Sequence, residues 1–350
     1  MVRRVAFAIP GDLATPTGGY GYDRRMIAEL QKLGWQVDLV LLGEGFPRPS
    51  AAQKAHADRM LGTMEGNHPV LIDGLALGVL PEAAAAVHAK RPLIALVHHP
   101  LALETGLSTT DAEAMRASER LALASASTVI VTSAPTARLL AQDYGVASDR
   151  ITVARPGSEG GPAAPATNDG VIRLLSIGAL VHRKGFDVLI AALAQVADLP
   201  WRLTIAGDRT RNPEVAARVD ADIARHRLGD RVQVLGAVPD GRIEALYGES
   251  DVFVLASRFE GYGMAYAEAL AHGLPVIGTT GGATAETVPA DAGILVAPDD
   301  VTAFARALRR LISSNTERER MAAAARTAAA ALPTWQDSAK LFAAAIEAAA

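Results

Sequence analysis

Short apolar runs alternate with helical patterns along most of this chain. In the first half, the predicted strands are Val5–Ile9, Val37–Leu42, Val70–Ile72, Leu93–Val97, Thr128–Val131 and Ile151–Val153. The helical patterns between them cover Tyr22–Leu33, Ala51–Leu61, Glu82–Lys90, Asp111–Ala124 and Thr136–Tyr144. Parallel strands need long crossover connections, which are usually helices. The alternation therefore predicts an α/β fold with a parallel, doubly wound sheet.

The pattern stops once and then restarts. Residues Arg155–Asp169 are rich in proline and glycine and have no periodicity, which is typical of a linker between domains. Six further strands are predicted, at Ile172–Ile177, Arg202–Ala206, Val232–Leu235, Val252–Leu255, Val276–Ile277 and Ile294–Val296. A length of 350 residues also favours two domains. We predict domains over residues 1–160 and 161–332, and a C-terminal helix over 333–350 with Thr334 as its N-cap.

Composition narrows the classes of function. The chain has no cysteine, so it has no disulfides and no thiolate metal sites, and a reducing compartment, the cytoplasm, is expected. A net charge of -4 gives no electrostatic reason to expect a nucleic-acid partner. The first apolar run is too short for a signal-peptide core, and no run reaches the about 18 uncharged apolar residues that a membrane span requires. We therefore expect no transmembrane segment.

The stretch Ser257–Gly273 carries the strongest candidate site. A short apolar run leads through Gly261 and Gly263 into Met264–Ala271, which has helix-forming composition. The start of a helix has unpaired N–H groups and partial positive charge, and glycines let its backbone come close to a ligand. This arrangement predicts a binding site for a diphosphate.

Two glutamates flank the predicted diphosphate site. Glu260 precedes the helix, and Glu268 lies about five residues past Gly263, which is roughly 7–8 Å along the helix axis. A nucleotide sugar carries hydroxyl groups on both sides of its diphosphate, and carboxylates accept hydrogen bonds from hydroxyls. The alternative is that Glu260 is a solvated loop acid and Glu268 a surface helix residue. On spacing alone, this alternative is as good as the binding role.

Other candidates lie in loops after predicted strands, where parallel sheets bind their ligands. Gly18 and Gly19 precede the first predicted helix, and we interpret their loop, Pro10–Tyr22, as a binding loop and not a simple turn. His98 and His99 follow the fourth strand. We favour His98, nearer the strand, as a group that donates a hydrogen bond or shuttles a proton; the alternative is a histidine satisfied by neighbouring backbone.

A cationic loop follows the first strand of the second half. Arg183 and Lys184 could neutralise a diphosphate whose charge grows as it leaves, although an exposed basic turn has the same composition. Gly281-Gly282 supplies a third loop in which backbone could approach a ligand closely. An Asp-x-Asp pair, Asp220 and Asp222, lies in the helical run Glu214–Leu228, where the two side chains diverge by about 200° and cannot share a metal.

With these motifs in place, the chain resembles a retaining glycosyltransferase of the GT-B fold, family 4, also called group 1. The most specific part of the resemblance is the Glu260 to Glu268 stretch followed by Gly-Leu-Pro-Val-Ile-Gly. It also rests on Gly18-Gly19, His98, Arg183-Lys184-Gly185, Gly236, Gly281-Gly282 and Glu286. The resemblance implies two Rossmann-like domains facing a cleft, an N-terminal acceptor domain and a C-terminal donor domain, with the last helix packing back on the first.

The resemblance also implies roles for single residues. Glu268 would hold the ribose hydroxyls, Glu260 would contact the donor sugar, and Arg183 and Lys184 would neutralise the leaving diphosphate. His98 would position the donor sugar or the acceptor. The backbone amides of Gly263, Met264 and Ala265 would bind phosphate, and Gly19 would line the phosphate side of the cleft. Gly18 and Gly261 are also predicted to bind the donor. The family often has an arginine where this chain has Ala179, so the diphosphate charge is expected to rest on Arg183 and Lys184 alone.

The activity that the resemblance implies is transfer of a hexosyl group from a UDP- or GDP-linked sugar to an acceptor hydroxyl. The acceptor would be a saccharide, a lipid-linked molecule or a small molecule. The implied path is front-face and metal-independent, with the leaving phosphate as base and with no cofactor. The alternatives are a nucleotide-sugar 2-epimerase and a non-catalytic nucleotide-sugar-binding protein. We expect a monomer or homodimer that is cytoplasmic or membrane-peripheral. Membrane attachment has little support, because residues 48–66 mix charges of both signs and do not form a basic amphipathic face.

Overall fold

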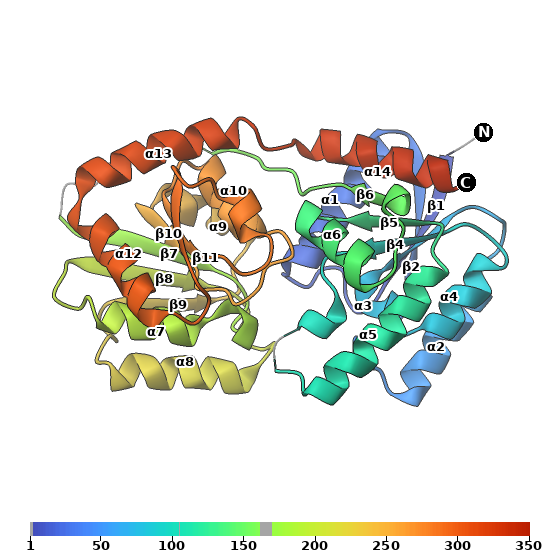
Figure 1. The fold of residues 1–350 in the computed structure, drawn as a ribbon, viewed down its shortest axis with the longest axis horizontal. Coiled ribbons are helices and arrows are strands. Elements are labelled where there is room, and N and C mark those ends of the chain that lie inside the picture. The colour runs from blue at the N-terminus through green and yellow to red at the C-terminus, as the bar shows by residue number, and fades with distance from the viewer. Residues whose placement is uncertain (1–2, 105, 162–169) are drawn as a thin grey trace. The chain divides into compact units, whose positions relative to one another are not determined.

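The structure is a computed structural model that describes residues 3–104, 106–161 and 170–350 (Figure 1). It divides into two compact units. Unit 1 comprises the chain up to Gly157 together with Pro333–Ala350, and unit 2 comprises Ser158–Leu332. The predicted linker, residues 155–169, spans the boundary between the units, and its positions 162–169 lie outside the described residues. The units are described separately below.

Unit 1 contains a six-stranded parallel sheet in the order β2-β1-β3-β4-β5-β6. Its strands form because apolar runs such as Val5–Ile9 and Leu93–Val97 are almost fully buried, as strands covered on both faces require. Each of the six predicted strands is present, as β1 Arg3–Ile9, β2 Trp35–Leu41, β3 Val70–Asp73, β4 Leu93–Val97, β5 Thr128–Val131 and β6 Ile151–Val153.

Helices connect these strands. They are α1 Gly18–Lys32, α2 Ala51–Gly62, α3 Gly74–Leu77, α4 Pro81–His88, α5 Thr109–Ala124 and α6 Ala134–Asp143, with short 3₁₀ turns η1 at Leu101–Leu103 and η2 at Ser148–Arg150. Most begin at a capping side chain; Ser50, for example, forms a capping box with Gln53. The predicted start of α1 was wrong. The hydroxyl of Thr17 accepts from the Tyr20 N–H, so Gly18 and Gly19 belong to the first turn of the helix.

The last helix, α14 (Trp335–Ala349), packs in unit 1 against α1 and the sheet. Thr334 caps it by accepting from the Asp337 N–H, and Ser338 donates to the Arg155 carbonyl. Phe342 is fully buried and stacks on Phe7 of β1 with 6.4 Å between ring centroids. The end of the chain is therefore part of the core that its beginning forms.

Unit 2 contains a second six-stranded parallel sheet, in the order β12-β11-β10-β7-β8-β9. All six predicted strands form, as β7 Ile172–Ile177, β8 Trp201–Ala206, β9 Val232–Gly236, β10 Val252–Val254, β11 Val276–Thr279 and β12 Gly293–Val296. Its helices are α7 Phe186–Ala194, α8 Pro213–Arg225, α9 Asp240–Gly248, α10 Met264–Ala271, α11 Thr284–Thr287, α12 Val301–Ser313 and α13 Asn315–Ala329, with a 3₁₀ turn η3 at His182–Lys184. The α/β class predicted from the sequence is confirmed.

The order of the strands fixes where ligands can be sought. Chain order reverses beside β1 in the first sheet and beside β7 in the second. Parallel sheets bind ligands beyond the carboxyl ends of strands at such reversals. In unit 1 the loops concerned follow β1, β3 and β4, and in unit 2 they follow β7, β10 and β11. The sequence-predicted site residues lie in, or directly after, these loops.

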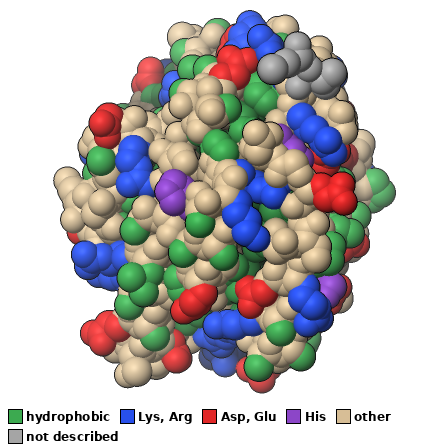
Figure 2. All heavy atoms as spheres, turned by 90° about the vertical axis from the view of Figure 1, so that its right-hand side faces the viewer, with side chains coloured by type: hydrophobic (Ala, Val, Ile, Leu, Met, Phe, Trp, Pro, Cys, Tyr) green, Lys and Arg blue, Asp and Glu red, His purple; other side chains and the backbone are tan. Residues whose placement is uncertain are grey.

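The surface offers no continuous field of one charge on the face shown in Figure 2. Lysine and arginine side chains there are interspersed with acidic and apolar ones.

Among the described residues, no helix combines the length and the apolar composition that crossing a bilayer requires.

Candidate functional site

The first group of predicted site residues meets in unit 2. Arg183 and Lys184 lie in η3, after β7, and Glu260 lies in the loop after β10; they meet because these two strands are neighbours in the sheet. Lys184 Nζ donates to Glu260 Oε1 at 2.7 Å, and Arg183 Nη1 donates to Oε2 at 3.2 Å. The hydroxyl of Ser257 donates to Oε1 at 2.6 Å. The cationic loop and the first glutamate therefore form one cluster.

Glu260 is buried and ionised. Only 6% of the residue is exposed, so it is not the solvated loop acid that its spacing also allowed. Burial by itself raises the pKa of this carboxyl, but Lys184 and Arg183 lower it more, to about 2. The carboxylate offsets one of the two positive charges, so the cluster keeps one net positive charge. Such a cluster suits an anion without holding two uncompensated cations.

Arg258 holds the two loops of this cluster together. Its guanidinium binds both carboxylate oxygens of Asp187 at 3.0 and 2.7 Å, and Nε donates to Asp299 at 2.8 Å. Its backbone N–H donates to the carbonyl of Arg183 at 2.7 Å. The sequence reasoning missed Arg258 and Asp187. Each stands within three residues of a predicted site residue, which was the available signal.

Gly281 and Gly282, predicted to let backbone approach a ligand, lie directly against the backbone of another loop. Gly282 pairs with Glu260 in an isolated parallel bridge, and the Ala283 N–H donates to the Glu260 carbonyl at 2.8 Å. A Cβ added at Gly281 would collide with the Arg258 carbonyl, and one at Gly282 would collide with the Glu260 carbonyl. The pair is glycine because the loop that carries Glu260 lies directly against it.

The start of α10 has the geometry of an anion site. Gly263 precedes the helix with φ 93°, a left-handed conformation that glycine adopts readily, and no side chain of the described residues caps this end. A Cβ there would also come within 2.8 Å of Tyr266 Cδ2. The first-turn N–H groups, at Met264 and Ala265, have no intrahelical acceptor and are available in principle to a ligand oxygen.

Glu268 is half-buried on α10 and is held by a tyrosine of the preceding helix. The hydroxyl of Tyr247 has two acceptors within hydrogen-bond distance of its one proton, Glu268 Oε2 at 2.9 Å and the Ala265 carbonyl at 3.1 Å. Burial, and then the negative charge of Glu268, raises the pKa of Tyr247 well above its ordinary value, so the phenol keeps its proton. His272 stacks on the Tyr247 ring with 4.8 Å between centroids. Tyr247, on α9, is a supporting residue that the sequence did not predict.

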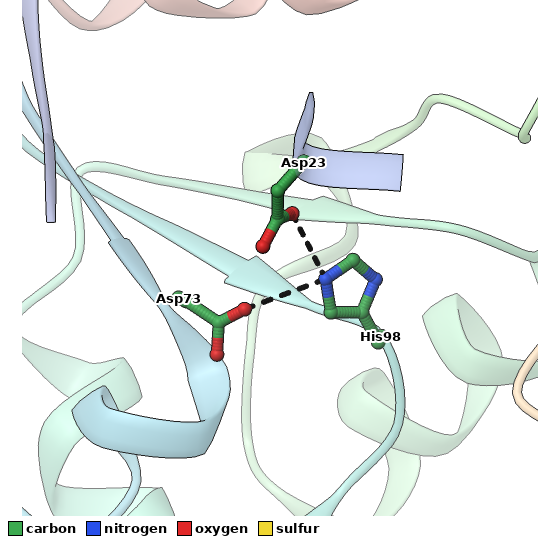
Figure 3. A group of neighbouring side chains, drawn as sticks. All are labelled: Asp23, Asp73 and His98. Carbon is green, nitrogen blue, oxygen red and sulfur yellow. Dashed lines mark hydrogen bonds and ion pairs between the residues drawn. The ribbon is translucent and has the colours of Figure 1, made fainter. Parts of the chain in front are cut away.

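The second group of predicted residues lies in unit 1, around His98 (Figure 3). His98 follows β4, Asp73 ends β3, and Asp23 lies in α1. The Nε2 atom of His98 is 3.2 Å from Asp23 Oδ1 and 3.5 Å from Asp73 Oδ2. A Cβ added at Gly19 would lie 3.4 Å from His98 Cδ2, so Gly19 borders the imidazole. Asp23 and Asp73 are acids that sequence reasoning missed.

Asp23 and His98 change each other's pKa values. Burial lowers the pKa of His98, but Asp23 and Asp73 raise it by more than burial lowers it, to about 10. Burial raises the pKa of Asp23 to about 7, against the opposing effect of His98. Within the described part of the chain, the three ligand atoms of Asp23, Asp73 and His98, all within 4.8 Å of one another, are also a spacing that could admit a metal ion. A proton on Nε2 shared between two carboxylates accounts for the same distances.

The remaining predicted residues do not share one environment. His99, the alternative to His98, is 3.4 Å from Glu104, in its own loop. Gly18 is exposed at the start of α1, and Gly261 is half-buried in the loop before α10. Asp220 and Asp222 lie in α8, where each pairs with a different arginine.

Comparisons with known proteins point to one family. Residues 162–328 match the family model described as glycosyl transferases group 1, and residues 70–157 match a glycosyl transferase 4-like domain. The lipopolysaccharide core biosynthesis mannosyltransferase LpsB of Rhizobium meliloti is 32% identical over 42% of this chain and 42% of its own length. The glycogen synthase of Mycobacterium tuberculosis strain H37Rv is 27% identical over 84% of this chain and 78% of its own length.

The chain spans only about half the length of several curated relatives. For the D-inositol 3-phosphate glycosyltransferase of Xylanimonas cellulosilytica it covers 54% of that protein, at 29% identity over 60% of this chain. Two solved structures match over nearly their full length. Sucrose-phosphate synthase of Thermosynechococcus elongatus has a TM-score of 0.81 at 21% identity, covering 98% of this chain and 100% of that one. Anabaena HepE, solved with UDP-glucose, has a TM-score of 0.78 at 19% identity, with 99% of each chain covered.

The two family matches fall one in each unit and together cover most of the chain, and the structural matches share its pair of parallel sheets. The resemblance predicted from the sequence is therefore confirmed: this chain belongs to the group 1 glycosyltransferases and has the GT-B fold.

Proposed function

We propose that the protein transfers a hexosyl group from a UDP- or GDP-linked sugar to an acceptor hydroxyl. The observation that carries this proposal is in unit 2. There, a helix start opened by Gly263, the cluster of Arg183 and Lys184 with Glu260, and the braced Glu268 all follow strands on the carboxyl side of one sheet. Each part suits one part of a nucleotide sugar.

In this proposal the diphosphate lies at the N-terminus of α10. The N–H groups of Met264 and Ala265 donate to phosphate oxygens, and the glycines at 261 and 263 let the backbone come close. Glu268 accepts from the ribose hydroxyls, with one of its oxygens fixed by Tyr247. Glu260, of which 6% is exposed, contacts the sugar.

The chemistry we propose retains the anomeric configuration. The acceptor oxygen forms a bond to the anomeric carbon on the face from which the diphosphate leaves, the bond from that carbon to the phosphate oxygen breaks, and the acceptor proton passes to the leaving phosphate. Arg183 and Lys184 stabilise the charge that develops on the diphosphate. These cations and the helix start supply that stabilisation, so we propose a metal-independent reaction without a cofactor.

A thermal-shift panel tests donor binding. UDP, GDP, ADP and their sugars are added to the protein without metal; UDP comes first because the Anabaena HepE structures were solved with UDP and UDP-glucose. A ligand that binds only the folded state raises the melting temperature. We expect one nucleoside diphosphate to do so, and Glu268→Ala to remove most of the shift. The control is Glu319→Ala, an exposed glutamate on α13. An equal shift in Glu268→Ala and wild type would refute the role of Glu268.

A turnover assay separates the proposed reaction from its alternatives. The stabilising donor is incubated with saccharide, lipid-linked and small-molecule acceptors, and products are followed by NMR. A transferase releases the nucleoside diphosphate and forms a new glycoside with retained configuration. A 2-epimerase converts the donor into its isomer without using an acceptor, and a binding protein leaves the donor unchanged. Product with inverted configuration would exclude the front-face path.

A further inference from the structure

His98 is held in unit 1 by two acids that face the same ring nitrogen. Nε2 lies 3.2 Å from Asp23 Oδ1 and 3.5 Å from Asp73 Oδ2. Asp23 is fully buried and Asp73 is 2% exposed, whereas His98 keeps about a fifth of its side chain exposed. Figure 3 shows the second ring nitrogen, Nδ1, on the opposite edge of the imidazole, directed away from both carboxylates. The ring therefore has one edge that faces the acids and one that faces away from them.

The partners of Nε2 determine its protonation. A carboxylate oxygen accepts hydrogen bonds, so a nitrogen that faces two of them must carry a proton. Two negative charges buried beside one neutral ring would be costly, because a buried charge needs an opposite charge or a bound proton. A second proton, on Nδ1, makes the ring an imidazolium that offsets one of these charges. The raised pKa of His98 agrees with this state.

The surroundings of the ring come from other elements of unit 1. The rings of Tyr22 and His98 pack edge to face, with 5.4 Å between their centroids and 82° between their planes. The Tyr22 hydroxyl donates to the Ala154 carbonyl at 2.8 Å. The hydroxyl of Thr132, beyond β5, donates to the His98 carbonyl at 3.2 Å. Gly19 leaves no side chain between α1 and the imidazole. A flip would move Nε2 away from its position 3.2 Å from Asp23 Oδ1 and 3.5 Å from Asp73 Oδ2.

Both acids are themselves anchored by the fold. Asp73 Oδ1 accepts from the Leu75 N–H at 2.6 Å and so caps α3, which leaves Oδ2 for the histidine. Asp23 Oδ2 is a buried oxygen for which the described residues supply no hydrogen-bond partner. Burial and the nearby Asp73 raise the pKa of Asp23, so this oxygen is where a further proton would reside. Tyr22, a further titratable group, packs on the ring.

We propose that Asp23 and Asp73 are positioning residues that hold His98 through Nε2 as an imidazolium and direct its Nδ1–H, as a hydrogen-bond donor, toward a sugar hydroxyl of the substrate. His98 then cannot act as a base, because neither ring nitrogen has a free lone pair. Its assignment to substrate rests on the proposed function, whereas its protonation state does not. His98 therefore does not take the proton released by the acceptor, which agrees with its transfer to the leaving phosphate in the proposed function.

NMR of the histidine rings tests the protonation state without any substrate. The full chain is labelled with ¹⁵N, and the signals of His98 are assigned by difference from His98→Gln. We expect both nitrogens to be protonated at pH 8, with a titration midpoint above that pH. In Asp73→Asn, which keeps an oxygen to cap α3, the midpoint should fall by about one pKa unit or more. Asp38→Asn, a surface acid of unit 1 paired with Arg4, should leave it unchanged.

Three results would overturn the assignment. One is a midpoint near 6.5 for His98 in the wild type. Another is an unchanged midpoint in both Asp73→Asn and Asp23→Asn. The third is a stoichiometric metal in the purified protein whose removal by EDTA shifts the His98 signals. Should Asp73→Asn fail to fold, Asp73→Glu keeps the charge at a different reach, and its His98 midpoint should stay above 8.

Activity as a function of pH tests the link to substrate. We expect the kcat/KM of the wild type to stay flat up to the His98 midpoint. We expect Asp73→Asn to lose activity as the pH rises through the lowered midpoint of its histidine, and to recover at lower pH, where that histidine regains the proton. His98→Gln, which offers a donor that does not titrate, should be weaker than wild type and flat. An imidazolium by NMR with wild-type kinetics in His98→Gln would overturn the role in substrate binding. A chain that transfers no sugar would instead overturn the proposed function, and the NMR result would stand.

Discussion

At the scale of single residues, Glu260 shows how burial changes the meaning of a charged side chain. It is bound by Lys184, Arg183 and Ser257, which together satisfy both of its oxygens. Removing one partner of a buried ion pair usually costs more than the pair contributes, because the other charge remains buried. Substitutions in this cluster therefore affect both stability and chemistry, and experiments must measure the two separately.

Lys184→Ala should lower turnover strongly, by about 100-fold or more, because a donor to developing negative charge is lost. It should also lower the melting temperature, since Glu260 loses its nearer cation at 2.7 Å. Turnover is measured well below the melting temperature of the variant. Lys340→Ala, an exposed lysine in α14, is the control and should change neither quantity. Wild-type turnover in Lys184→Ala would remove this lysine from the site.

Glu260→Gln should change how stability depends on pH. The folded state holds the pKa of Glu260 at about 2, against an ordinary 4.5. The carboxylate therefore contributes stability that is fully present above about pH 4.5 and is lost as the pH falls toward 2. Its pH-dependent part is on the order of 3 kcal/mol. Urea unfolding at pH 3 and pH 6 should show a smaller difference in Glu260→Gln than in the wild type; an identical difference would contradict the assigned ion pairs.

At the scale of elements, the start of α10 depends on a backbone conformation and not on a side-chain cap. Gly263 has φ 93°, and the next residues enter the helix directly. The loop before it is fastened by Arg258 to Asp187 and Asp299, and by Gly282 to Glu260. These contacts hold the loop that leads into α10 in place without a ligand.

Gly263→Ala should weaken both this element and donor binding. A left-handed conformation costs a residue with a Cβ about 1–2 kcal/mol, and the added atom would also crowd Tyr266. We expect a loss of that size in the free energy of unfolding and a reduced thermal shift with the nucleoside diphosphate. Gly229→Ala is matched to it, because a Cβ at Gly229 meets nothing within 4 Å. Equal behaviour of the two variants would show that Gly263 is not required.

At the scale of the whole molecule, the chain returns at its end to the unit in which it began. Helix α14 completes the core of unit 1 through Phe342, whose ring stacks on Phe7 and packs against Tyr22. Tyr22 in turn contacts His98. The C-terminal helix thus supports His98 through Tyr22, although Phe342 and His98 are far apart in the sequence.

Phe342→Ala should therefore destabilise unit 1 by about 3–5 kcal/mol, the usual cost of removing a buried aromatic ring. The neighbouring Leu341 is 51% exposed, so Leu341→Ala should change stability by less than about 0.5 kcal/mol. Calorimetry measures both variants. Because the proposed nucleotide site belongs to unit 2, the stabilising nucleoside diphosphate should still bind to Phe342→Ala. Equal stability of the two variants would contradict the packing of α14.

The sequence by itself determined the order of strands and helices, the presence of two parallel sheets and the loops in which candidate residues lie. Those features are local: apolar periodicity and glycine placement act over a few residues, so they can be recognised in the sequence. The start of α1 was mispredicted because one threonine cap extended the helix into a glycine-rich stretch.

Only the tertiary structure decided which side chains meet. Asp23 and His98 are 75 residues apart, and Lys184 and Glu260 are 76 apart, so each pair depends on which strands are neighbours in a sheet. The sequence showed neither the two acids behind His98, nor the tyrosine that holds Glu268, nor that Gly281 and Gly282 face backbone. Burial converts these distant groups into coupled ones, because a charge removed from water must find its partner inside the protein.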